Sequence, residues 1–231
     1  MDRYNKNKNL ISKEEQKVLK NSKVCVLGCG GLGGYIIEFL TRIGIGNISV
    51  VDGDSFDVTN LNRQLLATEN NIKKNKAIEA AKRAELVNSE VKVKPICEFV
   101  SEENATDILE EHDIIIDALD DINTRKIVQK FAEELKIPLI HGAIAGWYGQ
   151  VCTIMPGDKS LDYIYKTNKS HGDEKELGNP SFTPALVAAI EASEAIKVIL
   201  NKGEIIRNEI IYIDLLYGEI EKIPLPSKHS D

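Results

Sequence analysis

The chain has 231 residues, 42% of them hydrophobic and 28% charged, which is the composition of an ordinary soluble domain that buries its core without disulfides. A formal net charge of −7 argues against a large nonspecific nucleic-acid surface. The N-terminus lacks the apolar stretch of a signal peptide, and the longest apolar runs are too short to span a bilayer. With no apolar run of that length, no membrane partner is expected. The four cysteines form no C-x-x-C pair, so we expect thiols in a reducing cytoplasm and no zinc site.

Strands and helices alternate through the first part of the chain, after a polar N-terminal helical arm over residues 1–20. Runs of β-branched residues predict buried strands at Lys23–Leu27, Asn47–Val51, Val91–Ile96, His112–Leu119 and Pro138–Gly142. Apolar residues at helical spacing predict the intervening helices at Leu32–Ile43, Asn71–Asn88, Asn104–Glu111 and Thr124–Leu135. This order predicts a single α/β domain over residues 21–231, with a Rossmann-like, mostly parallel sheet and helices on both faces.

The alternation stops after residue 148. Gly149–Met155 reads as a strand, and the polar, glycine-containing stretch 156–180 is predicted to be a mobile crossover loop. Pro184–Leu200 is a helix with proline at its start. Ile210–Leu216 and Glu219–Leu225 flank a Tyr-Gly turn as in a hairpin, so antiparallel strands extend the sheet at its C-terminal end.

The strongest local signal is a glycine cluster between the first strand and the first long helix. Gly28, Gly30 and Gly33 have the G-x-G-x-x-G spacing, and Gly31 and Leu32 lie inside the same loop. Glycine lets the backbone approach a phosphate, and the helix N-terminus offers free N–H groups to the anion. Asp52 ends the next strand, where a carboxylate can bind ribose hydroxyls. Alone, this pattern fits NAD, FAD or ATP equally well.

Charged residues downstream favour ATP. A polar cluster follows the second strand and comprises Asp54, Asn60, Asn62, Arg63 and Gln64. Arg63 can clamp a phosphate with its planar fork, and Lys76 adds a second positive charge. Asp120 follows a strand at the carboxyl edge of the sheet, and a carboxylate there suits Mg²⁺ beside substrate phosphates. Each of these charges alone is typical of a plain surface group, so it is their combination that predicts an ATP site with magnesium.

The ordered set GCGGLGG (28–34), VDGD (51–54), TNLNRQ (59–64), Lys76 and D-x-x-D-x-x-x-x-R (117–125) resembles the ThiF/MoeB/HesA family, relatives of the ubiquitin-activating enzymes. The resemblance covers most of the chain from about residue 20. It implies adenylation of the C-terminal Gly-Gly carboxylate of a small ubiquitin-like sulfur carrier protein, with release of pyrophosphate. It implies that Gly31 and its neighbours hold ATP, that Asp52 binds the ribose, that Asn60, Arg63 and Lys76 contact the phosphates, and that Asp120 binds Mg²⁺ or positions the reacting groups. It also implies a homodimer in which the N-terminal segment reaches the partner's site.

Several family features are changed here. The zinc-binding C-x-x-C pairs are absent, and the loop 156–180 has no cysteine for a later sulfur transfer. The arginine expected in the N-terminal segment is Lys6, and Asp121 stands where the family has asparagine. Cys29 and Cys152 are expected to be buried, and His141 is expected to be a hydrogen-bonded core histidine.

Three other functions remain open from the sequence. The same family includes an ATP-dependent tRNA-modifying dehydratase that cyclises threonylcarbamoyladenosine and can lack the zinc cysteines. A regulatory nucleotide-binding subunit without turnover is disfavoured by the presence of Arg63, Lys76 and Asp120. An NAD oxidoreductase would have no need for this set of charges.

Overall fold

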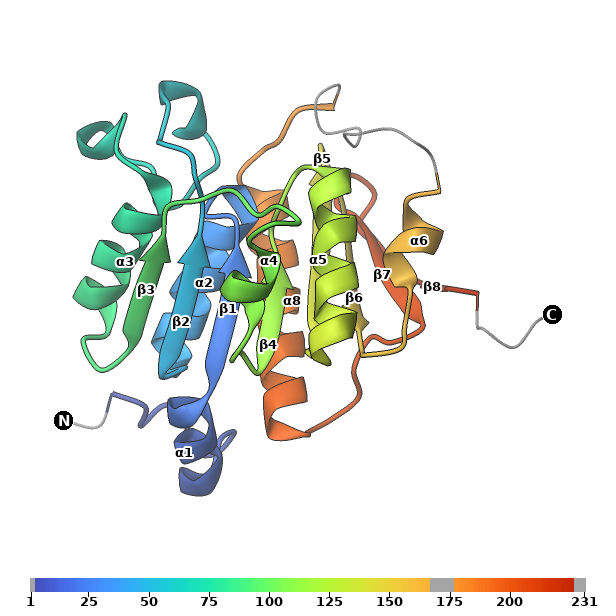
Figure 1. Ribbon diagram of the computed structural model, residues 1–231, viewed down its shortest axis with the longest axis horizontal. Helices are drawn as coiled ribbons and strands as arrows, with labels where there is room; N and C mark the ends of the chain where they lie inside the picture. Colours follow the sequence, from blue (N-terminus) through green and yellow to red (C-terminus); the bar gives the residue numbers. More distant parts are fainter. Residues whose placement is uncertain (1–2, 167–176, 227–231) are drawn as a thin grey trace.

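The computed structural model describes residues 3–166 and 177–226. These residues form one eight-stranded sheet in the order β3-β2-β1-β4-β5-β6-β7-β8 (Figure 1). The first five strands pair in parallel, and the last three continue the sheet with antiparallel pairing. The strands are β1 (Lys23–Leu27), β2 (Asn47–Val51), β3 (Lys92–Ile96), β4 (Ile114–Asp117), β5 (Leu139–Ala145), β6 (Tyr148–Ile154), β7 (Glu209–Asp214) and β8 (Glu219–Pro224). The predicted Rossmann-like sheet with an antiparallel extension is therefore confirmed.

Helices cover both faces of the sheet, which is why its central strands are apolar on both sides. Side chains of α2, α3 and α8 join one buried cluster with Val24 and Val26 of β1. Side chains of α4, α5 and α6 join the other with Cys25 and Leu27, the alternate residues of the same strand. The helices are α1 (Lys13–Asn21), α2 (Gly31–Ile43), α3 (Lys76–Val87), α4 (Ala105–Leu109), α5 (Ile122–Leu135), α6 (Ser160–Ile164) and α8 (Phe182–Leu200), with short 3-10 turns η1 (Val58–Asn60) and η2 (Glu69–Asn71).

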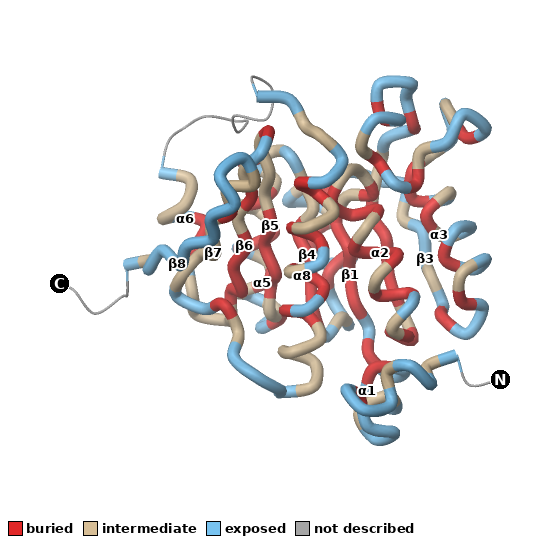
Figure 2. The backbone as a smooth tube through the Cα atoms, turned by 180° about the vertical axis from the view of Figure 1, so that it is seen from behind, coloured by how far each residue is buried: buried red, intermediate tan, exposed pale blue. Residues whose placement is uncertain are grey.

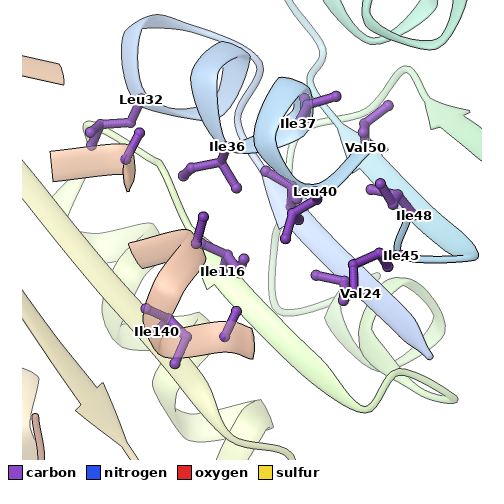
Figure 3. Close-up of a cluster of buried hydrophobic side chains, with 14 of the residues drawn as sticks. Val24, Leu32, Ile36, Ile37, Leu40, Ile45, Ile48, Val50, Ile116 and Ile140 are labelled. Carbon is purple, nitrogen blue, oxygen red and sulfur yellow. The ribbon is translucent and has the colours of Figure 1, made fainter. Parts of the chain in front are cut away.

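The larger core lies between α2 and the centre of the sheet. Figure 2 shows that the buried residues are concentrated along the central strands and the helices that cover them. In the close-up of Figure 3, Ile36 and Leu40 of α2 point toward Ile116 of β4 and Val24 of β1. Fully burying side chains of this size contributes about 1.5–3 kcal/mol each. This packing fixes α2, and with it the glycine turn that precedes the helix.

Side-chain caps set where the helices nearest the site begin. The Asn75 side chain accepts a hydrogen bond from the N–H of Ile78, so α3 starts at Lys76. The Asp121 side chain accepts one from the N–H of Thr124, so α5 starts at Ile122. Each cap therefore places a residue of the candidate site, Lys76 after one and Asp120 before the other, at a helix N-terminus.

Some element boundaries differ from the prediction. The helix predicted over Asn71–Asn88 begins only at Lys76, because η2 and the Asn75 cap occupy its first residues. The loop predicted over 156–180 contains the helix α6, and its residues 167–176 lie outside the described part of the chain. Within the N-terminal segment, regular helix begins at Lys13, after Ser12 and Glu15 form a capping box. Among the described residues, no helix combines the length and apolarity needed to cross a bilayer.

Candidate functional site

The turn between β1 and α2 is tightly packed backbone. Gly28 has a φ of 94°, a conformation that L side chains rarely adopt. A Cβ at Gly33 would lie 1.8 Å from the carbonyl oxygen of Gly28, so only glycine lets the helix approach the turn this closely. The N-cap position, Gly30, provides no side-chain hydrogen bond to the first turn of α2. The N–H groups of that turn are thus available to an anionic ligand.

A cavity of about 230 Å³ opens beside this turn, at the carboxyl ends of the parallel strands. Its walls come from the glycine turn, the end of β2, the segment after η1, the start of α3 and the β4–α5 connection. Ten of the residues predicted from sequence line it: Gly28, Gly30, Gly31, Leu32, Asp52, Asp54, Arg63, Gln64, Lys76 and Asp120. Residues far apart in the chain therefore converge at the sheet edge where open α/β folds bind ligands.

Asp52 is held by the backbone around it. Its two carboxylate oxygens accept hydrogen bonds from the N–H groups of Cys29 and Asp54, each at 2.8 Å. Burial raises the pKa of the Asp52 carboxyl, while the Cys29 N–H and the Lys76 ammonium oppose that shift. The Asn75 side chain donates to the carbonyl oxygens of Asp52 and Asp54, at 3.1 Å in both cases. Asp52 is thus fixed beside the glycine turn, at the wall of the cavity.

Two of the cations that line the cavity, Lys76 and Arg63, are also held by the protein. Lys76 is only 8% exposed, and its Nζ lies 3.1 Å from Oδ2 of Asp54. Arg63 donates from Nη1 to the carbonyl oxygen of Thr59 and to Oδ1 of Asn62, both at 3.0 Å. Since these contacts restrict both side chains, little conformational entropy remains to be lost when an anion binds.

Three predicted residues do not line the cavity. The Asn60 side chain accepts from the N–H of Asp57 at 3.0 Å and stabilises the η1 turn. Asn62 donates to the carbonyl oxygen of Asn179 at 3.2 Å, so it links the η1 segment to the residues before α8. Gly33 packs against Gly28 and shapes the turn from behind. Their contribution is to support the cavity walls.

Two buried amide oxygens at the cavity lack a partner within the described residues. They are Oε1 of Gln64 and Oδ1 of Asn179. Both residues line the cavity, and Gln64 is 7% exposed and lies close to Gly30. A buried acceptor without a hydrogen bond costs about 1–3 kcal/mol. A ligand that donates hydrogen bonds, as the amino and hydroxyl groups of a nucleoside do, can satisfy these atoms.

Asp120 lies between β4 and α5 with an exposed side chain at the cavity. Its neighbour Asp121 also lines the cavity, but its Oδ2 is engaged by the N–H and the hydroxyl of Thr124, each at 2.7 Å. Asp120 is therefore the more accessible carboxylate of this pair, since one oxygen of Asp121 is committed to the cap of α5. The described residues contain no group of three or more His, Cys, Asp or Glu side chains that could hold a metal ion by themselves.

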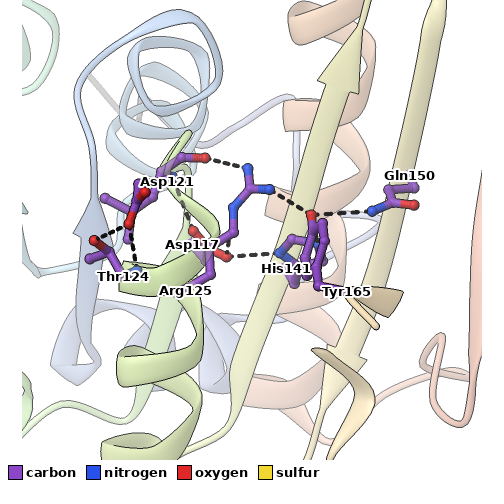
Figure 4. A network of polar contacts seen from close by, with 8 residues as sticks. Asp117, Asp121, Thr124, Arg125, His141, Gln150 and Tyr165 are labelled. Atoms are coloured by element: carbon purple, nitrogen blue, oxygen red, sulfur yellow. Dashed lines mark hydrogen bonds and ion pairs between the residues drawn. The ribbon is translucent and has the colours of Figure 1, made fainter. Parts of the chain in front are cut away.

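Behind Asp120 lies a buried polar network that Figure 4 shows in close-up. His141, fully buried, shares a hydrogen bond of 2.8 Å between its Nδ1 and Oδ2 of Asp117, which confirms the expected core histidine. Nε2 of His141 lies 3.2 Å from the hydroxyl of Tyr165, and that hydroxyl lies 2.5 Å from Nη1 of Arg125. Arg125 itself lines the cavity, so the network connects the sheet interior to the site.

Cys29 and Cys152 are buried, as expected, and burial raises the pKa of both thiols. Both are therefore thiols at neutral pH, and neither is an activated nucleophile.

The N-terminal segment lies at the other end of the domain (Figure 1). The Tyr4 hydroxyl accepts a hydrogen bond from Asn88, the residue that ends α3, and the Tyr4 ring lies against Gly44 at the end of α2. Both helices start at the cavity, so this anchor holds Lys6 away from the cavity of its own chain.

Comparison with known proteins agrees with this geometry. The model of the ThiF family matches residues 4–231. The chain belongs to the ThiF family. A SAMP-activating enzyme E1 from Haloferax volcanii is 30% identical over 97% of this chain and 85% of its own length. A sulfur carrier protein adenylyltransferase from Thermus thermophilus is 32% identical over 96% of this chain and 86% of its own. The structure of E. coli MccB has the same fold as this ThiF-family chain, with a TM-score of 0.84 and 24% identity over 97% of this chain and 69% of MccB.

Sequence reasoning missed several residues of this ThiF-family site. Asn179 lies outside every motif, and only the fold brings it beside Gln64. Tyr165 follows α6 in a stretch with no local signal for function. Arg125 was part of the family pattern without a role, although its spacing from Asp121 on the first turn of a helix was a usable signal that it faces the same edge.

Proposed function

We propose that this chain is an ATP-dependent adenylyltransferase that activates the C-terminal glycine carboxylate of a small ubiquitin-like sulfur carrier protein and releases pyrophosphate. The observation that carries this proposal is the convergence of the open glycine turn with Arg63, Lys76 and Asp120 in one cavity. The relatives named as a sulfur carrier protein adenylyltransferase and a SAMP-activating enzyme support a protein substrate and favour it over tRNA.

The residues fit ATP by two observations. The backbone cradle at Gly28 and Gly33 excludes any side chain, and the orphaned oxygens of Gln64 and Asn179 accept hydrogen bonds. In this proposal the first turn of α2, Arg63 and Lys76 bind the phosphates, and Asp52 binds the ribose hydroxyls.

The reaction needs positioning and charge neutralisation more than proton transfer. An oxygen of the ionised glycine carboxylate attacks the α-phosphorus, a new P–O bond forms, and the bond to the pyrophosphate oxygen breaks. Arg63 and Lys76 neutralise the negative charge that would repel the attacking carboxylate and that accumulates on the leaving group. Asp120 is the candidate ligand for Mg²⁺, which would neutralise phosphate charge as well, since Mg²⁺ usually binds one or two carboxylates together with substrate phosphates.

We also propose a homodimer, in the cytoplasm. The helices α2 and α8 pack together and present half-buried apolar side chains, among them Tyr35, Phe39 and Ile190. A second copy would bury this face. Because Lys6 is exposed and lies away from its own cavity, a dimer is the arrangement in which it could approach a site, that of the partner. The cysteines among the described residues are free thiols, as suits a reducing compartment.

The test is ATP–pyrophosphate exchange with a panel of Gly-Gly-ending carrier proteins, with and without tRNA, and with Mg²⁺ or with EDTA. We expect exchange that requires a carrier and Mg²⁺. Asp120→Ala should abolish it while leaving the fold intact, and Asp107→Ala, at an exposed position of α4, is the matched control. Exchange that occurs only with tRNA would refute the proposal, as would full activity of Asp120→Ala for the assigned site.

A further inference from the structure

Leu119, the residue before Asp120, has both of its backbone polar groups bound by buried side chains. Its N–H donates to Oδ1 of Asp117 at 3.0 Å. Its carbonyl oxygen accepts from Nη2 of Arg125. Asp117 is fully buried and Arg125 is 5% exposed, so neither contact is open to competition from bulk water. The backbone that leads into Asp120 is therefore clamped on two sides.

The two clamping side chains are themselves connected through His141 and Tyr165. Oδ2 of Asp117 meets Nδ1 of His141 at 2.8 Å, and Nε2 of His141 meets the Tyr165 hydroxyl at 3.2 Å. The hydroxyl meets Nη1 of Arg125 at 2.5 Å, which brings the path back to Leu119. We call this closed path the Leu119 ring; Figure 4 shows its side chains, which come from β4, β5, α5 and the residue after α6.

Chemistry fixes the direction of every hydrogen bond in the Leu119 ring. Arginine has donors only, so the Tyr165 oxygen accepts from Arg125. The Tyr165 hydroxyl keeps its own hydrogen, which it donates to Nε2 of His141 when the imidazole is neutral and that nitrogen is unprotonated. The proton of the neutral imidazole therefore sits on Nδ1 and is donated to Asp117, and burial, which lowers the pKa of His141, favours this neutral form. Both halves of the ring thus run from the donors of Arg125 to the acceptors of Asp117, one through Tyr165 and His141 and the other through the backbone of Leu119. Every donor meets an acceptor in this arrangement, which makes the ring a rigid support.

We propose that Tyr165 and His141 are positioning residues that, by holding Arg125 and Asp117 against Leu119, place Asp120 in the cavity for adenylation. This inference rests on the proposed function of the cavity. Tyr165 directly follows α6, in the connection between β6 and α8. The Leu119 ring thus ties that connection to the segment that carries the candidate magnesium ligand.

The first experiment compares Tyr165→Phe with the wild type and with Tyr212→Phe, which changes a β7 tyrosine outside the ring. Tyr165→Phe keeps the aromatic side chain that packs on Arg125 and removes only the hydroxyl. We expect a fall of about tenfold in the turnover number for carrier-dependent exchange, because the hydroxyl's contacts with Arg125 and with His141 are both lost. The Kd for ATP measured in EDTA should stay within about twofold, because the glycine turn, Arg63 and Lys76 are untouched. Tyr212→Phe should change neither quantity.

Two further measurements separate positioning from a general structural effect. Amide hydrogen exchange at Leu119, followed by NMR, should be about tenfold faster in Tyr165→Phe than in the wild type. In a double-mutant cycle with Asp120→Asn, Tyr165→Phe should cause little further loss of turnover, since its effect acts through Asp120. The proposal would be overturned if the losses of turnover from the two substitutions were fully additive, or if amide hydrogen exchange at Leu119 were unchanged in Tyr165→Phe.

A second variant breaks the same ring at another point. His141→Asn keeps a donor toward Asp117 and removes the acceptor for Tyr165, and we expect the same fall in turnover and the same faster exchange at Leu119. It decides the question if Tyr165→Phe fails to fold. If the wild type showed no carrier-dependent ATP–pyrophosphate exchange, the proposed function would be rejected. The rate of amide hydrogen exchange at Leu119 would still show whether the Leu119 ring holds that segment.

Discussion

The glycine turn makes a sharp prediction, because two adjacent glycines of α2 differ in what a methyl group would meet. A Cβ at Gly33 would lie 1.8 Å from the Gly28 carbonyl oxygen and 2.7 Å from its carbon, which are backbone atoms. A Cβ at Gly34 would lie 3.3 Å from Cγ of Leu66, the nearest atom and part of a side chain. Both residues are in the first turns of the same helix. Gly33→Ala and Gly34→Ala are therefore a matched pair.

The magnitudes follow from these contacts. Glycine to alanine in a helix is worth about 0.5–1 kcal/mol in favour of alanine at either position. At Gly33 that gain is outweighed, because the helix must move away from the turn by roughly 1 Å or more, and misplacement on that scale costs about 100-fold where groups must be positioned. We expect Gly33→Ala to weaken ATP binding by about 100-fold and to lower the free energy of unfolding by about 1–3 kcal/mol. At Gly34 the gain in helix propensity and the cost of the close contact with Leu66 nearly cancel, so the free energy of unfolding should change by less than about 1 kcal/mol.

Isothermal calorimetry with ATP and urea unfolding of the three proteins measure both quantities. The comparison of the two variants removes the shared effect of helix propensity. Wild-type ATP affinity in Gly33→Ala would refute the idea that close approach of the helix to the turn forms the phosphate cradle. Equal losses in both variants would show that general damage to α2, and not the contact with Gly28, is the cause.

Two other predictions concern buried charge. Glu191 of α8 is fully buried with no hydrogen-bond partner for its carboxyl oxygens within the described residues, and burial, with Asp117 nearby, raises its pKa well above the ordinary value. A carboxyl whose pKa is higher in the folded than in the unfolded protein leaves stability intact below the unfolded pKa and lowers it as pH rises toward the folded pKa. The free energy of unfolding should therefore fall with rising pH more steeply in the wild type than in Glu191→Gln. Parallel curves of this free energy against pH, measured by urea unfolding, would contradict the prediction. Lys76→Met should weaken ATP binding by about 10- to 100-fold through loss of a charge-assisted contact. Lys82→Met, on the exposed side of the same helix, should leave ATP binding unchanged. Equal ATP affinities of the two variants, measured by calorimetry, would remove Lys76 from the site.

The fold was predictable because its signals are local and repeated. Each central strand is a short β-branched run that is buried on both faces, and such runs alternate with amphipathic helices only in parallel α/β sheets. The boundaries were less predictable, because they depend on single capping side chains. The η2 turn ends at Asn71 and the Asn75 cap starts α3, so the helix does not extend back over residues 71–75 as the apolar periodicity predicted.

The candidate site also has residues that could be predicted from the sequence and residues that could not. Cavity residues that offer a charge or an open backbone, such as Arg63, Lys76 and Gly31, could be named because their chemistry is unusual at those positions. Asn60 could not be separated from them, because an asparagine side chain that stabilises its own turn looks the same in sequence as one that contacts a phosphate.

The Leu119 ring shows why supporting residues escape such reasoning. His141 lies 24 residues from both Asp117 and Tyr165, and no periodicity relates the three. Only the sheet order, which places β5 beside β4, and the packing of α6 on α5 bring them together. In our proposal the cavity needs them nonetheless, because the side chain of Asp120 is exposed and its position depends on the backbone that carries it. Where catalysis depends on placing charges, the residues that fix the backbone behind an exposed carboxylate contribute to the rate without touching the substrate.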